Sequence, residues 1–574
     1  MAPRIIKSPF PPVPPLPPLN FHTFLFQFPP GNGIPKDHTI HVDGLTGETR
    51  SVGQFLERVK DGATALTASI SQGGLGIAPG SDEIVGILSP NSLDYIVLVH
   101  SCLYSTIPFA LLQSHTTQAG LNYLLGKINA TRIFVHPSLL SQALQGAKDI
   151  GLPADRIYVL GGQVHGRKDF DALIKNVRSK DLQRQEVVPA KKDTLAYLLF
   201  SSGTSGPPKG VMISHGNLIF SIVQNLLNMQ EAVKVMPPMQ PTSPPMWLCF
   251  LPFYHSFGLH YFMFRTFVVP ITLVILPRWN LDQVLEAIPQ YKITHLALVP
   301  SLIHQLVNSP KTEKADLSSL QFAGSGAAYL PPELSKKMSK FLKGSPEIPE
   351  GYGLSEATIS SLARPLPGML GLQPAPRSTG ILLAGQEARI VREDGTDADV
   401  NEPGEFWIKG PNVVLGYWKD EAATKATFLP DGWLKTGDRF RVDENGTFFF
   451  EDRMKDTLKI SGVQVAPAEI ETTILSQPDN IVTDVAVAGV PGGRTHDEKV
   501  PRAWLVLSDS GKALGEKEVA RRVNAWVEER LSKYKWLKGG VGFVDEVPKS
   551  PTGKVLRRVL QDAYAKELKE KAKL

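Results

Sequence analysis

Residues 199–210 read Leu-Phe-Ser-Ser-Gly-Thr-Ser-Gly-Pro-Pro-Lys-Gly and continue a strand-like apolar run that begins at Ala196. Glycines let backbone amides turn towards an anion, hydroxyl groups add hydrogen-bond donors, and a lysine adds a point charge. The spacing is not that of the common nucleotide-hydrolase loop, because Lys209 follows Gly206 by three residues and precedes Gly210. The stretch predicts a phosphate-binding loop on an α/β scaffold. A flexible Ser/Gly surface loop is the alternative.

Outward from this loop, strand-like apolar runs alternate with helix-like patterns, which is typical of parallel sheets flanked by helices. The pairs and single strands that show it are 83–88 with 93–104, 132–135 with 138–147, 196–200, 248–251, 271–275, and 296–299 with 301–307. Later stretches are β-rich, at 387–391, 404–409 and 447–451. We therefore expect an α/β fold with a large N-terminal domain of parallel-type sheets plus a β-barrel-like part.

The last part of the chain reads as a separate α+β unit, with strands at 484–490, 502–507 and 541–543 and a helix at 516–531. Its length lies within the range of independent domains. We predict four segments: a proline-rich arm at 1–36, a large N-terminal domain at 37–452, a linking segment at 453–456, and a small C-terminal domain at 457–574. The prolines at 11–18 resist helix, so the arm should be extended or loosely ordered.

Composition excludes several classes of protein. The chain has 574 residues, 42% hydrophobic and 20% charged, with a formal net charge of +5. That balance is typical of a globular protein and gives no case for nucleic acid binding. The best candidate run for a membrane helix, Phe267 to Leu276, is too short and contains Pro270, so it reads as a buried strand. Cys102 and Cys249 have no metal-ligand spacing; buried packing is favoured over a nucleophilic role.

The sequence ends in Ala572, Lys573 and Leu574, which resemble the small–basic–Leu peroxisomal address read by an import receptor. A solvated helix end is the alternative, because residues 567–573 carry mixed charges. Peroxisomal location is therefore the expectation, with a cytoplasmic location as the other possibility.

The string at 201–210 closely resembles the signature of the adenylate-forming superfamily, in particular its acyl- and aryl-CoA ligases of the 4-coumarate–CoA ligase type. The resemblance runs from about Asp82 to about Arg558, and further motifs follow in the family's order. Gly351-Tyr352-Gly353-Leu354-Ser355-Glu356 is specific. The resemblance implies that Tyr352 stacks on adenine, that Ser355 meets the α-phosphate, and that Glu356 holds Mg²⁺. Glu350 stands where the family often has glutamine.

Other motifs imply the rest of the nucleotide site. Asp438, at the end of 431–438, would bind both ribose hydroxyls, which suits the two oxygens of a carboxylate. Arg453 resembles a second ribose contact, Lys455 the hinge pivot, and Lys554 the catalytic lysine of the family. The resemblance assigns ATP or AMP binding to Ser201, Ser202, Gly203, Thr204, Ser205, Gly206, Lys209, Ala327, Glu350, Gly351, Tyr352, Ser355, Asp438, Arg453, Lys455, Lys459 and Lys554.

The motif at 251–259 resembles the family landmark beside the acyl pocket, so His255, Phe257 and Ile359 are the expected contacts of the acid. Alone, His255 would more often be a structural histidine. Leu259 and the pair at 327–328 add to an apolar pocket suited to an aryl or medium-chain acyl group.

The resemblance implies an enzyme that joins a carboxylic acid to CoA in two steps, through an acyl-adenylate. It assigns ATP and the acid substrate to the domain at 37–452, a hinge to 453–456, and a mobile C-terminal domain with the catalytic lysine to 457–574. Lys554, Lys209, Glu356 and His255 are the expected catalytic residues, with ATP, Mg²⁺ and CoA required. Arg278, Ser461 and Gly462 are the expected CoA contacts, although Arg278 could equally be surface charge. Two other readings stay open: an adenylating enzyme with a carrier-protein or other acceptor, and a non-catalytic nucleotide-binding regulator.

Overall fold

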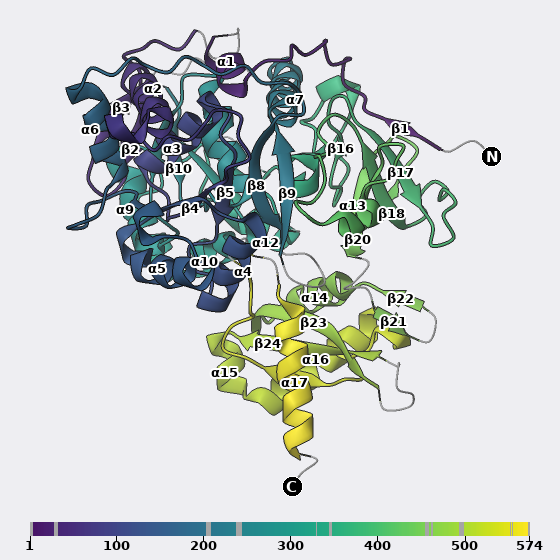
Figure 1. Cartoon of the computed structure of the whole chain (residues 1–574). Helices are drawn as coiled ribbons and strands as arrows, with labels where there is room; N and C mark the ends of the chain where they lie inside the picture. The colour runs from purple at the N-terminus through teal and green to yellow at the C-terminus, as the bar shows by residue number, and fades with distance from the viewer. Residues whose placement is uncertain are drawn as a thin grey trace.

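The structure is a computed structural model that describes residues 4–27, 33–201, 208–236, 244–328, 330–343, 347–453, 458–460, 463–492, 499–550, 553 and 555–571. Of residues 453, 459–460, 463–464, 569 and 571 only the backbone is described. The part of the chain before residue 454 forms the large upper body in Figure 1, and the part after it forms the smaller lower body.

The first large sheet has the strand order β7-β6-β4-β5-β8-β9. Its first five strands are parallel, and β9 closes one edge antiparallel to β8. Its strands are almost continuous apolar runs because both faces of the sheet are covered. Their bounds are β4 (Val85–Leu88), β5 (Phe109–Leu112), β6 (Arg132–Val135), β7 (Ile157–Val159), β8 (Leu195–Ser201) and β9 (Lys209–Ser214).

The second large sheet has the order β13-β12-β10-β11-β2-β3, parallel except for the edge strand β3. The carboxyl ends of β10, β12 and β13 lead into the segments around His255, Pro300 and Gly326. In open α/β sheets this edge is where ligands bind. The strands are β2 (Thr39–Asp43), β3 (Thr49–Ser51), β10 (Met246–Cys249), β11 (Thr272–Ile275), β12 (His295–Leu298) and β13 (Phe322–Ser325).

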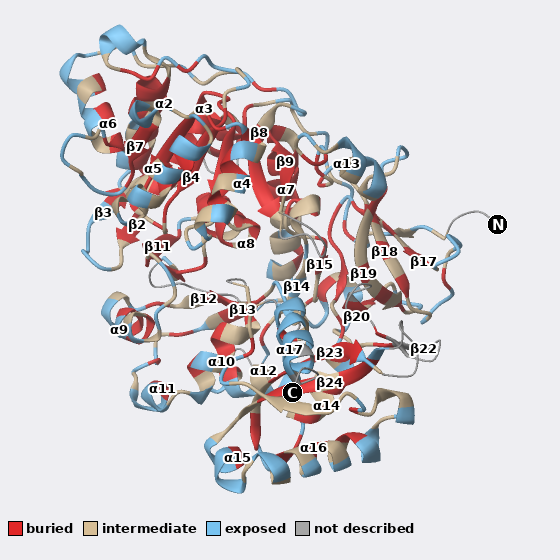
Figure 2. Cartoon of the chain, turned by 60° about the horizontal axis from the view of Figure 1, so that its bottom comes forward, coloured by how far each residue is buried: buried red, intermediate tan, exposed pale blue. Residues whose placement is uncertain are grey.

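Helices cover the faces of both sheets, and α3 is buried along nearly its whole length (Figure 2). Its one acidic residue, Asp94, forms ion pairs with Arg50 and Arg58. Helix α2 begins at a capping box in which Ser51 and Gln54 bond each other's backbone, which fixes its first turn. The main covering helices are α2 (Val52–Thr67), α3 (Leu93–Tyr104), α4 (Gln118–Ile128), α5 (Leu140–Asp149), α6 (Phe170–Ser179), α7 (His215–Val233), α9 (Leu281–Tyr291), α10 (Pro300–Asn308), α11 (Pro310–Lys314) and α12 (Pro332–Ser339).

The β-rich part is an antiparallel five-stranded sheet of order β1-β17-β18-β19-β20. A three-stranded sheet, β14-β15-β16, lies beside it. The strands are β1 (Ile6–Lys7), β17 (Glu387–Val391), β18 (Gly404–Lys409), β19 (Leu434–Val442), β20 (Phe448–Arg453), β14 (Gly351–Tyr352), β15 (Leu362–Ala363) and β16 (Ile381–Leu382). Helix α13 (Glu421–Thr427) connects β18 to β19.

Residues 4–20 of the proline-rich arm are extended, which is one of the two expectations, and they pack against the large body. Its strand β1 pairs with β17, and Phe10 is buried. Buried Asn20 donates hydrogen bonds of 2.8 Å to the carbonyl oxygens of Leu103 and Val188. The same asparagine caps a short helix, α1 (Phe21–Phe26), which the prolines had masked in the sequence.

The smaller body contains the sheet β23-β24-β25 and the hairpin β21-β22. The smaller body has a hydrophobic core of its own. Helix α16 contributes Val519, Val523 and Val527 to this core, because they recur at helical spacing and so lie on one face of the helix. The outer faces of α15, α16 and α17 are exposed in Figure 2. The elements are β21 (Leu458–Ile460), β22 (Val463–Val465), α14 (Pro467–Leu475), β23 (Val482–Pro491), β24 (Lys499–Leu507), α15 (Asp509–Leu514), α16 (Glu516–Arg530), β25 (Val541–Phe543) and α17 (Arg557–Lys571).

The fold class expected from the sequence is confirmed: two parallel-type sheets flanked by helices, a β-rich part, and a small α+β C-terminal unit. The predicted extent of the strand at 267–276 was wrong. The run at 267–276 is not one strand, because a 3₁₀ turn (Arg265–Phe267) and Pro270 precede the strand β11. Cys102 and Cys249 are buried, and burial raises the pKa of both thiols. Among the described helices, none is both long and apolar enough to cross a membrane.

Candidate active site

The ends of the predicted phosphate loop are held by a hairpin. Ser201 is the last residue of β8 and Lys209 the first of β9, and the two are register partners. The Ser201 hydroxyl donates a hydrogen bond of 3.0 Å to Oε1 of Glu356. The structure therefore brings three residues from motifs 155 positions apart in the sequence to one place.

A fourth member of this cluster, Tyr417, was not predicted from the sequence. Its hydroxyl donates a hydrogen bond of 3.0 Å to Oε1 of Glu356, and Nζ of Lys209 lies 4.8 Å from its ring centre. Burial, and then the carboxylate of Glu356, raise the pKa of the Tyr417 phenol, so it stays a donor. We call Ser201, Lys209, Glu356 and Tyr417 the phosphate cluster.

Backbone hydrogen bonds fix Tyr417 in this position. The Leu415 amide donates a hydrogen bond to the carbonyl of Met212 in β9, and the Met212 amide donates one to the carbonyl of Gly416. The Trp418 amide donates a hydrogen bond to the carbonyl of Gly210. The turn that carries Glu356 is tied to the same segment, because the amide of Val414 bonds the Glu356 carbonyl. No local pattern around residue 417 could have indicated this contact.

The predicted adenine and ribose contacts lie together. The Tyr352 hydroxyl donates a hydrogen bond of 2.6 Å to Oδ2 of Asp438, which is only 4% exposed. Glu350 lies on the same strand segment and accepts a hydrogen bond of 3.2 Å from the Leu330 amide through Oε2. Burial raises the pKa of Glu350 to about 7, against the weaker lowering by that bond and by Arg364. Arg453 is the register partner of Asp438.

The backbone at this site is strained. Ala327, Thr358 and Ile359 have φ of 69°, 48° and 79°, which is uncommon for non-glycine residues and most unusual for a β-branched one. A Cβ on Gly353 would lie 1.3 Å from the carbonyl oxygen of Ile359. Strain of this kind clusters at functional sites and persists only where the surroundings enforce it.

The predicted acid contacts lie next to the predicted nucleotide contacts. The Phe257 ring lies 3.3 Å from the position of a Cβ on Gly326, which directly precedes Ala327. Burial lowers the pKa of His255 to about 4, so its ring is neutral at pH 7. Nδ1 of His255 accepts a hydrogen bond of 3.3 Å from the Phe257 amide, which orients the ring. Ser355 donates a bond of 3.4 Å to Ser256, linking the two motifs.

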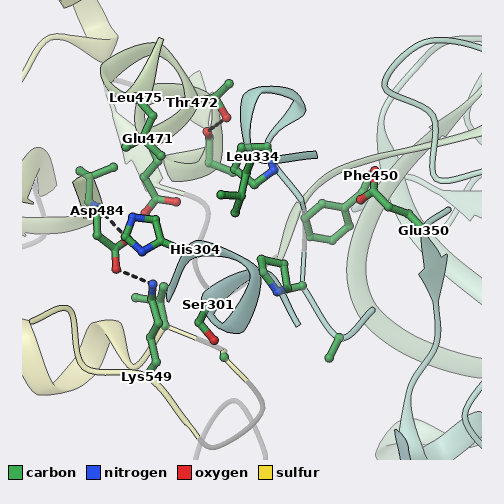
Figure 3. Close-up of a pocket in the computed structure, with 18 of the residues that line it drawn as sticks. Ser301, His304, Leu334, Glu350, Phe450, Glu471, Thr472, Leu475, Asp484 and Lys549 are labelled. Atoms are coloured by element: carbon green, nitrogen blue, oxygen red, sulfur yellow. Dashed lines mark hydrogen bonds and ion pairs between the residues drawn. The ribbon is translucent and has the colours of Figure 1, made fainter. Parts of the chain in front are cut away.

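A pocket opens between the two bodies of the protein (Figure 3). From the large body it is lined by Ala327, Glu350, Gly351, Tyr352 and Asp438 among others. The small body contributes Glu471, Asp484, Lys549, Gly553, Val555 and Arg557. Gly553 makes a close contact, since a Cβ there would lie 2.8 Å from Oγ of Ser301. The described neighbours of Lys554 on both sides thus line the pocket that holds Tyr352 and Asp438.

Several predicted residues lie outside the described part of the chain: Ser202, Gly203, Thr204, Ser205, Gly206, Lys455, Ser461, Gly462, Lys554 and the tripeptide at 572–574. The side chains of Arg453 and Lys459 are also outside it. Arg278 is exposed after β11 and does not line the pocket between the bodies.

The donor set at Glu356 suits Mg²⁺ in one way. Within the described residues, no group of three or more His, Cys, Asp or Glu side chains could hold a metal. Mg²⁺ bound with a nucleotide needs only one or two carboxylates, because phosphate oxygens and waters complete its coordination. Ser201 and Tyr417 both bond Oε1 of Glu356, which leaves Oε2 for such a role.

Comparisons with known proteins agree with this geometry. Residues 32–418 match the family model described as AMP-binding enzyme, and residues 469–554 match its C-terminal domain model. The chain is 33% identical to a probable 4-coumarate–CoA ligase of Dictyostelium discoideum and 30% identical to the acyl-CoA ligase AFT1-1 of Alternaria alternata. Each alignment covers 92% of this chain, and 92% and 90% of the relatives.

Solved structures show the same architecture. An ATP-bound MatB from Rhodopseudomonas palustris aligns with a TM-score of 0.77 at 25% identity, over 95% of this chain and 98% of that one. An anthranilate CoA ligase with anthranoyl-AMP aligns with a TM-score of 0.81 at 23% identity, over 97% and 99%. With two family models spanning both bodies, the chain belongs to the AMP-binding enzyme family.

Proposed function

We propose that the protein is an ATP-dependent acid–CoA ligase that forms an acyl-adenylate and then an acyl-CoA thioester, releasing pyrophosphate and AMP. The observation that carries the proposal is the phosphate cluster: Ser201, Lys209 and Tyr417 surround the Glu356 carboxylate, one turn away from Tyr352 and its partner Asp438. An anion site thus adjoins a site with an aromatic ring and a buried carboxylate, as AMP requires.

In the first step, the substrate carboxylate lies beside His255 and Phe257 and attacks the α-phosphorus of ATP. An acyl–phosphate bond forms, the bond to the β-phosphate oxygen breaks, and pyrophosphate leaves. Lys209 and Lys554 offset the negative charge on the phosphates, and Mg²⁺ bound at Glu356 would neutralise more of it. Positioning and preorganised charge supply most of the acceleration in such a displacement.

His255 takes part as a neutral ring. Its lowered pKa of about 4 leaves it uncharged at pH 7, so it does not form an ion pair that would hold the substrate carboxylate in an unreactive state. The ring forms one wall of the acid pocket beside Phe257. Its Nδ1 accepts the bond from the Phe257 amide, so Nε2 carries the proton and donates a hydrogen bond to the acid.

In the second step, the thiolate of CoA attacks the acyl carbon, the thioester C–S bond forms, the acyl–phosphate bond breaks, and AMP leaves with its electron pair. We propose that the small body turns about Lys455 between the steps, which withdraws Lys554 and presents Lys459, Ser461 and Gly462. Arg278, exposed after β11, would meet a CoA phosphate. No enzyme nucleophile is required.

The two half-reactions test this assignment separately. Lys554→Ala should lower acid-dependent pyrophosphate release by about 10²–10³-fold, the typical effect of removing one preorganised donor. Thioester formation from preformed acyl-AMP should remain. Lys566→Ala, on the exposed side of α17, is the matched control. Equal loss of both half-reactions would contradict the two-face assignment.

The acid and the acceptor are tested together. Aryl and fatty acids with ATP, Mg²⁺ and CoA should give AMP and a thioester. Pyrophosphate release without thioester formation would favour another acceptor, and nucleotide binding without either would favour a regulator. The tripeptide at 572–574 stays a prediction about location, tested by whether a fluorescent fusion ending in it enters peroxisomes.

A further inference from the structure

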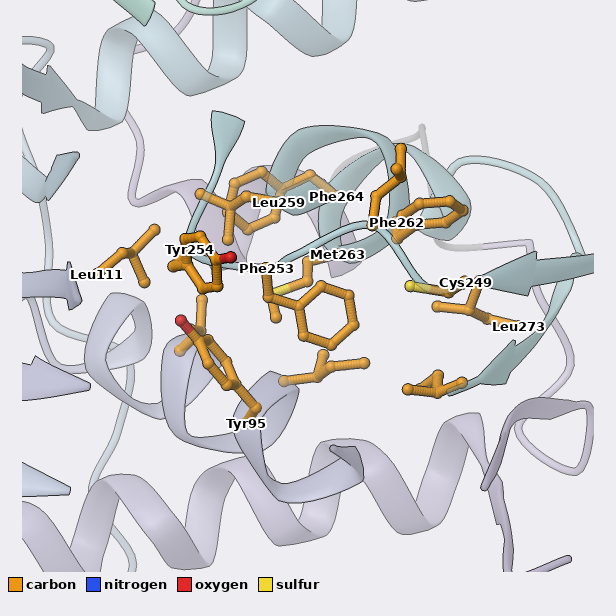
Figure 4. Close-up of a cluster of buried hydrophobic side chains, with 14 of the residues drawn as sticks. Tyr95, Leu111, Cys249, Phe253, Tyr254, Leu259, Phe262, Met263, Phe264 and Leu273 are labelled. Atoms are coloured by element: carbon orange, nitrogen blue, oxygen red, sulfur yellow. The ribbon is translucent and has the colours of Figure 1, made fainter. Parts of the chain in front are cut away.

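One stripe of an otherwise buried helical run retains accessible surface. The run consists of α8 (Ser256–Gly258), the π-helical η4 (Leu259–Phe264) and the 3₁₀ turn η5 (Arg265–Phe267). Within it Phe257, Tyr261 and Arg265 are only partly buried, and the other residues are buried. The three are spaced by four, close to one helical turn, so they face the same way. Figure 4 shows the buried side of the run, where Leu259, Phe262 and Met263 pack around Phe253.

The stripe starts at the reaction centre. Phe257 lies against Gly326, beside Ala327 of the nucleotide pocket. Its ring centre is 5.6 Å from that of Tyr261, which in turn lies 4.9 Å from that of Trp247. Trp247 stacks on His295 at 5.3 Å. An acyl group that extends away from the phosphate along this stripe would therefore pass aromatic side chains.

The far end of the stripe is a cation. Nη2 of Arg265 donates a hydrogen bond of 2.8 Å to Oγ of Ser360, whereas Nε is enclosed and has no hydrogen-bond partner. No carboxylate in the described part of the chain forms an ion pair with this guanidinium. Burial lowers its pKa to about 10, so it remains charged at pH 7. Arginine side chains in such surroundings are normally paired with an anion.

Ser360 places this cation within reach of the acid. It follows Ile359, the strained residue expected to contact the acyl group, and both side chains are partly accessible. Nε1 of Trp247 is a second enclosed donor without a partner. The Arg265 side chain as a whole is partly accessible, so an anion on the ligand would supply the partner that its charge lacks among the described residues.

On the basis of the function proposed above, we infer that the preferred acid carries an anionic oxygen group, such as a second carboxylate, at the end remote from the reacting carboxyl, and that Arg265 binds it. Arg265 lies eight residue steps after Phe257, roughly 12 Å at the helical rise of 1.5 Å per residue. An extended chain gains about 1.2 Å per bond, so roughly ten bonds, as in a chain of about ten carbons, would span that length. Guanidinium and carboxylate match in a two-pronged geometry.

Matched acids test this inference. Octanedioate and decanedioate are compared with octanoate and decanoate in acid-dependent pyrophosphate release. The wild-type protein should favour each diacid at least tenfold in kcat/KM. In Arg265→Met the diacids should lose about 100-fold, while the monoacids change less than threefold. Arg265→Lys should recover part of the diacid activity, and Ser360→Ala, which keeps the charge, should stay within about fivefold of wild type.

Binding gives a second readout. Calorimetry with non-hydrolysable acyl-adenylate analogues bearing the same four tails should show the same preference and its loss in Arg265→Met. Equal loss for diacids and monoacids, or a wild-type preference for monoacids, would overturn the inference and leave Arg265 a purely structural residue. Failure of every acid to release pyrophosphate would instead sink the proposed function.

Discussion

The hydroxyl of Tyr417 bonds the same oxygen of Glu356, Oε1, that accepts the bond from Ser201. The two donors come from different parts of the fold: Ser201 ends β8, and Tyr417 lies beyond the β-rich sheet strand β18. Because Oε1 accepts two hydrogen bonds, the orientation of the carboxylate is fixed. The pair also places the Tyr417 ring beneath the ammonium group of Lys209.

Tyr417→Phe should weaken the use of Mg-ATP without unfolding the protein. The ring that faces Lys209 remains, but the carboxylate loses one of its two orienting bonds. Loss of a hydrogen bond to a charged group typically costs about 1.5–3 kcal/mol, so kcat/KM for ATP should fall roughly 10- to 100-fold. Pyrophosphate release over a MgCl₂ titration measures it, and the half-saturating MgCl₂ concentration should rise.

Tyr291→Phe is the control, because its hydroxyl bonds the Gly44 carbonyl at 3.3 Å, far from the phosphate cluster. If Tyr417→Phe responds to MgCl₂ as Tyr291→Phe does, the orienting role is wrong.

The sequence predicted those parts of the site that are written in contiguous motifs. Ser201, Lys209, Glu356, Tyr352 and Asp438 each lie in a short string of characteristic residues, and the structure brings them into two adjoining groups. The fold class followed from the same local information, since apolar runs and helical periodicity are properties of neighbouring residues.

What could not be predicted depends on long-range pairing. Tyr417 reaches Glu356 only because its segment bonds along β9, and nothing near residue 417 in the sequence indicates that pairing. Helix α1 was hidden because the preceding prolines suggested an extended arm throughout. Likewise the left-handed backbone of Ile359 arises from packing, because a β-branched residue has no local preference for it.

Gly353→Ala should disrupt the turn that follows Tyr352. A Cβ there would lie 1.3 Å from the Ile359 carbonyl oxygen, so the turn must move. We expect loss of adenylation by more than 100-fold and a clear fall in the thermal unfolding midpoint. Gly126→Ala is the matched control: Gly126 is exposed within α4, and its Cβ would meet only Ile150, at 4.0 Å. That change should raise stability by about 0.5–1 kcal/mol.

Glu350→Gln should stabilise the protein at alkaline pH. The pKa of Glu350 is raised by burial from 4.5 to about 7, so the folded state binds its proton more tightly than the unfolded chain does. The destabilisation by its charge is therefore absent below pH 4.5, grows between the two values, and is complete above about pH 7. Removing this charge should raise the free energy of unfolding by roughly 2–3 kcal/mol at pH 8.5.

Thermal unfolding at pH 4.5 and 8.5 measures this effect. The variant's midpoint should exceed that of wild type only at the higher pH. Glu313→Gln, at an exposed position in α11, should shift neither value. A gain of equal size at both pH values would point to packing instead of charge.

Asp484→Asn should impair the first half-reaction more than the second. Asp484 of β23 forms an ion pair with Lys549, at the start of the segment that leads to Gly553 and Lys554 (Figure 3). Their side chains are 23% and 21% exposed, so the pair is partly shielded from solvent. It lies against His304 of α10, whose pKa is lowered by burial, so a neutral ring faces the pair across the two bodies.

Without the ion pair between Asp484 and Lys549, the segment should be held less firmly against Ser301. We expect a roughly fivefold to tenfold fall in pyrophosphate release, with thioester formation from acyl-AMP unchanged. Lys512→Ala breaks an exposed pair with Asp509 in the same body and should change neither rate. An equal fall in both half-reactions would mean that Asp484 supports the small body as a whole and not the presentation of its lysine loop.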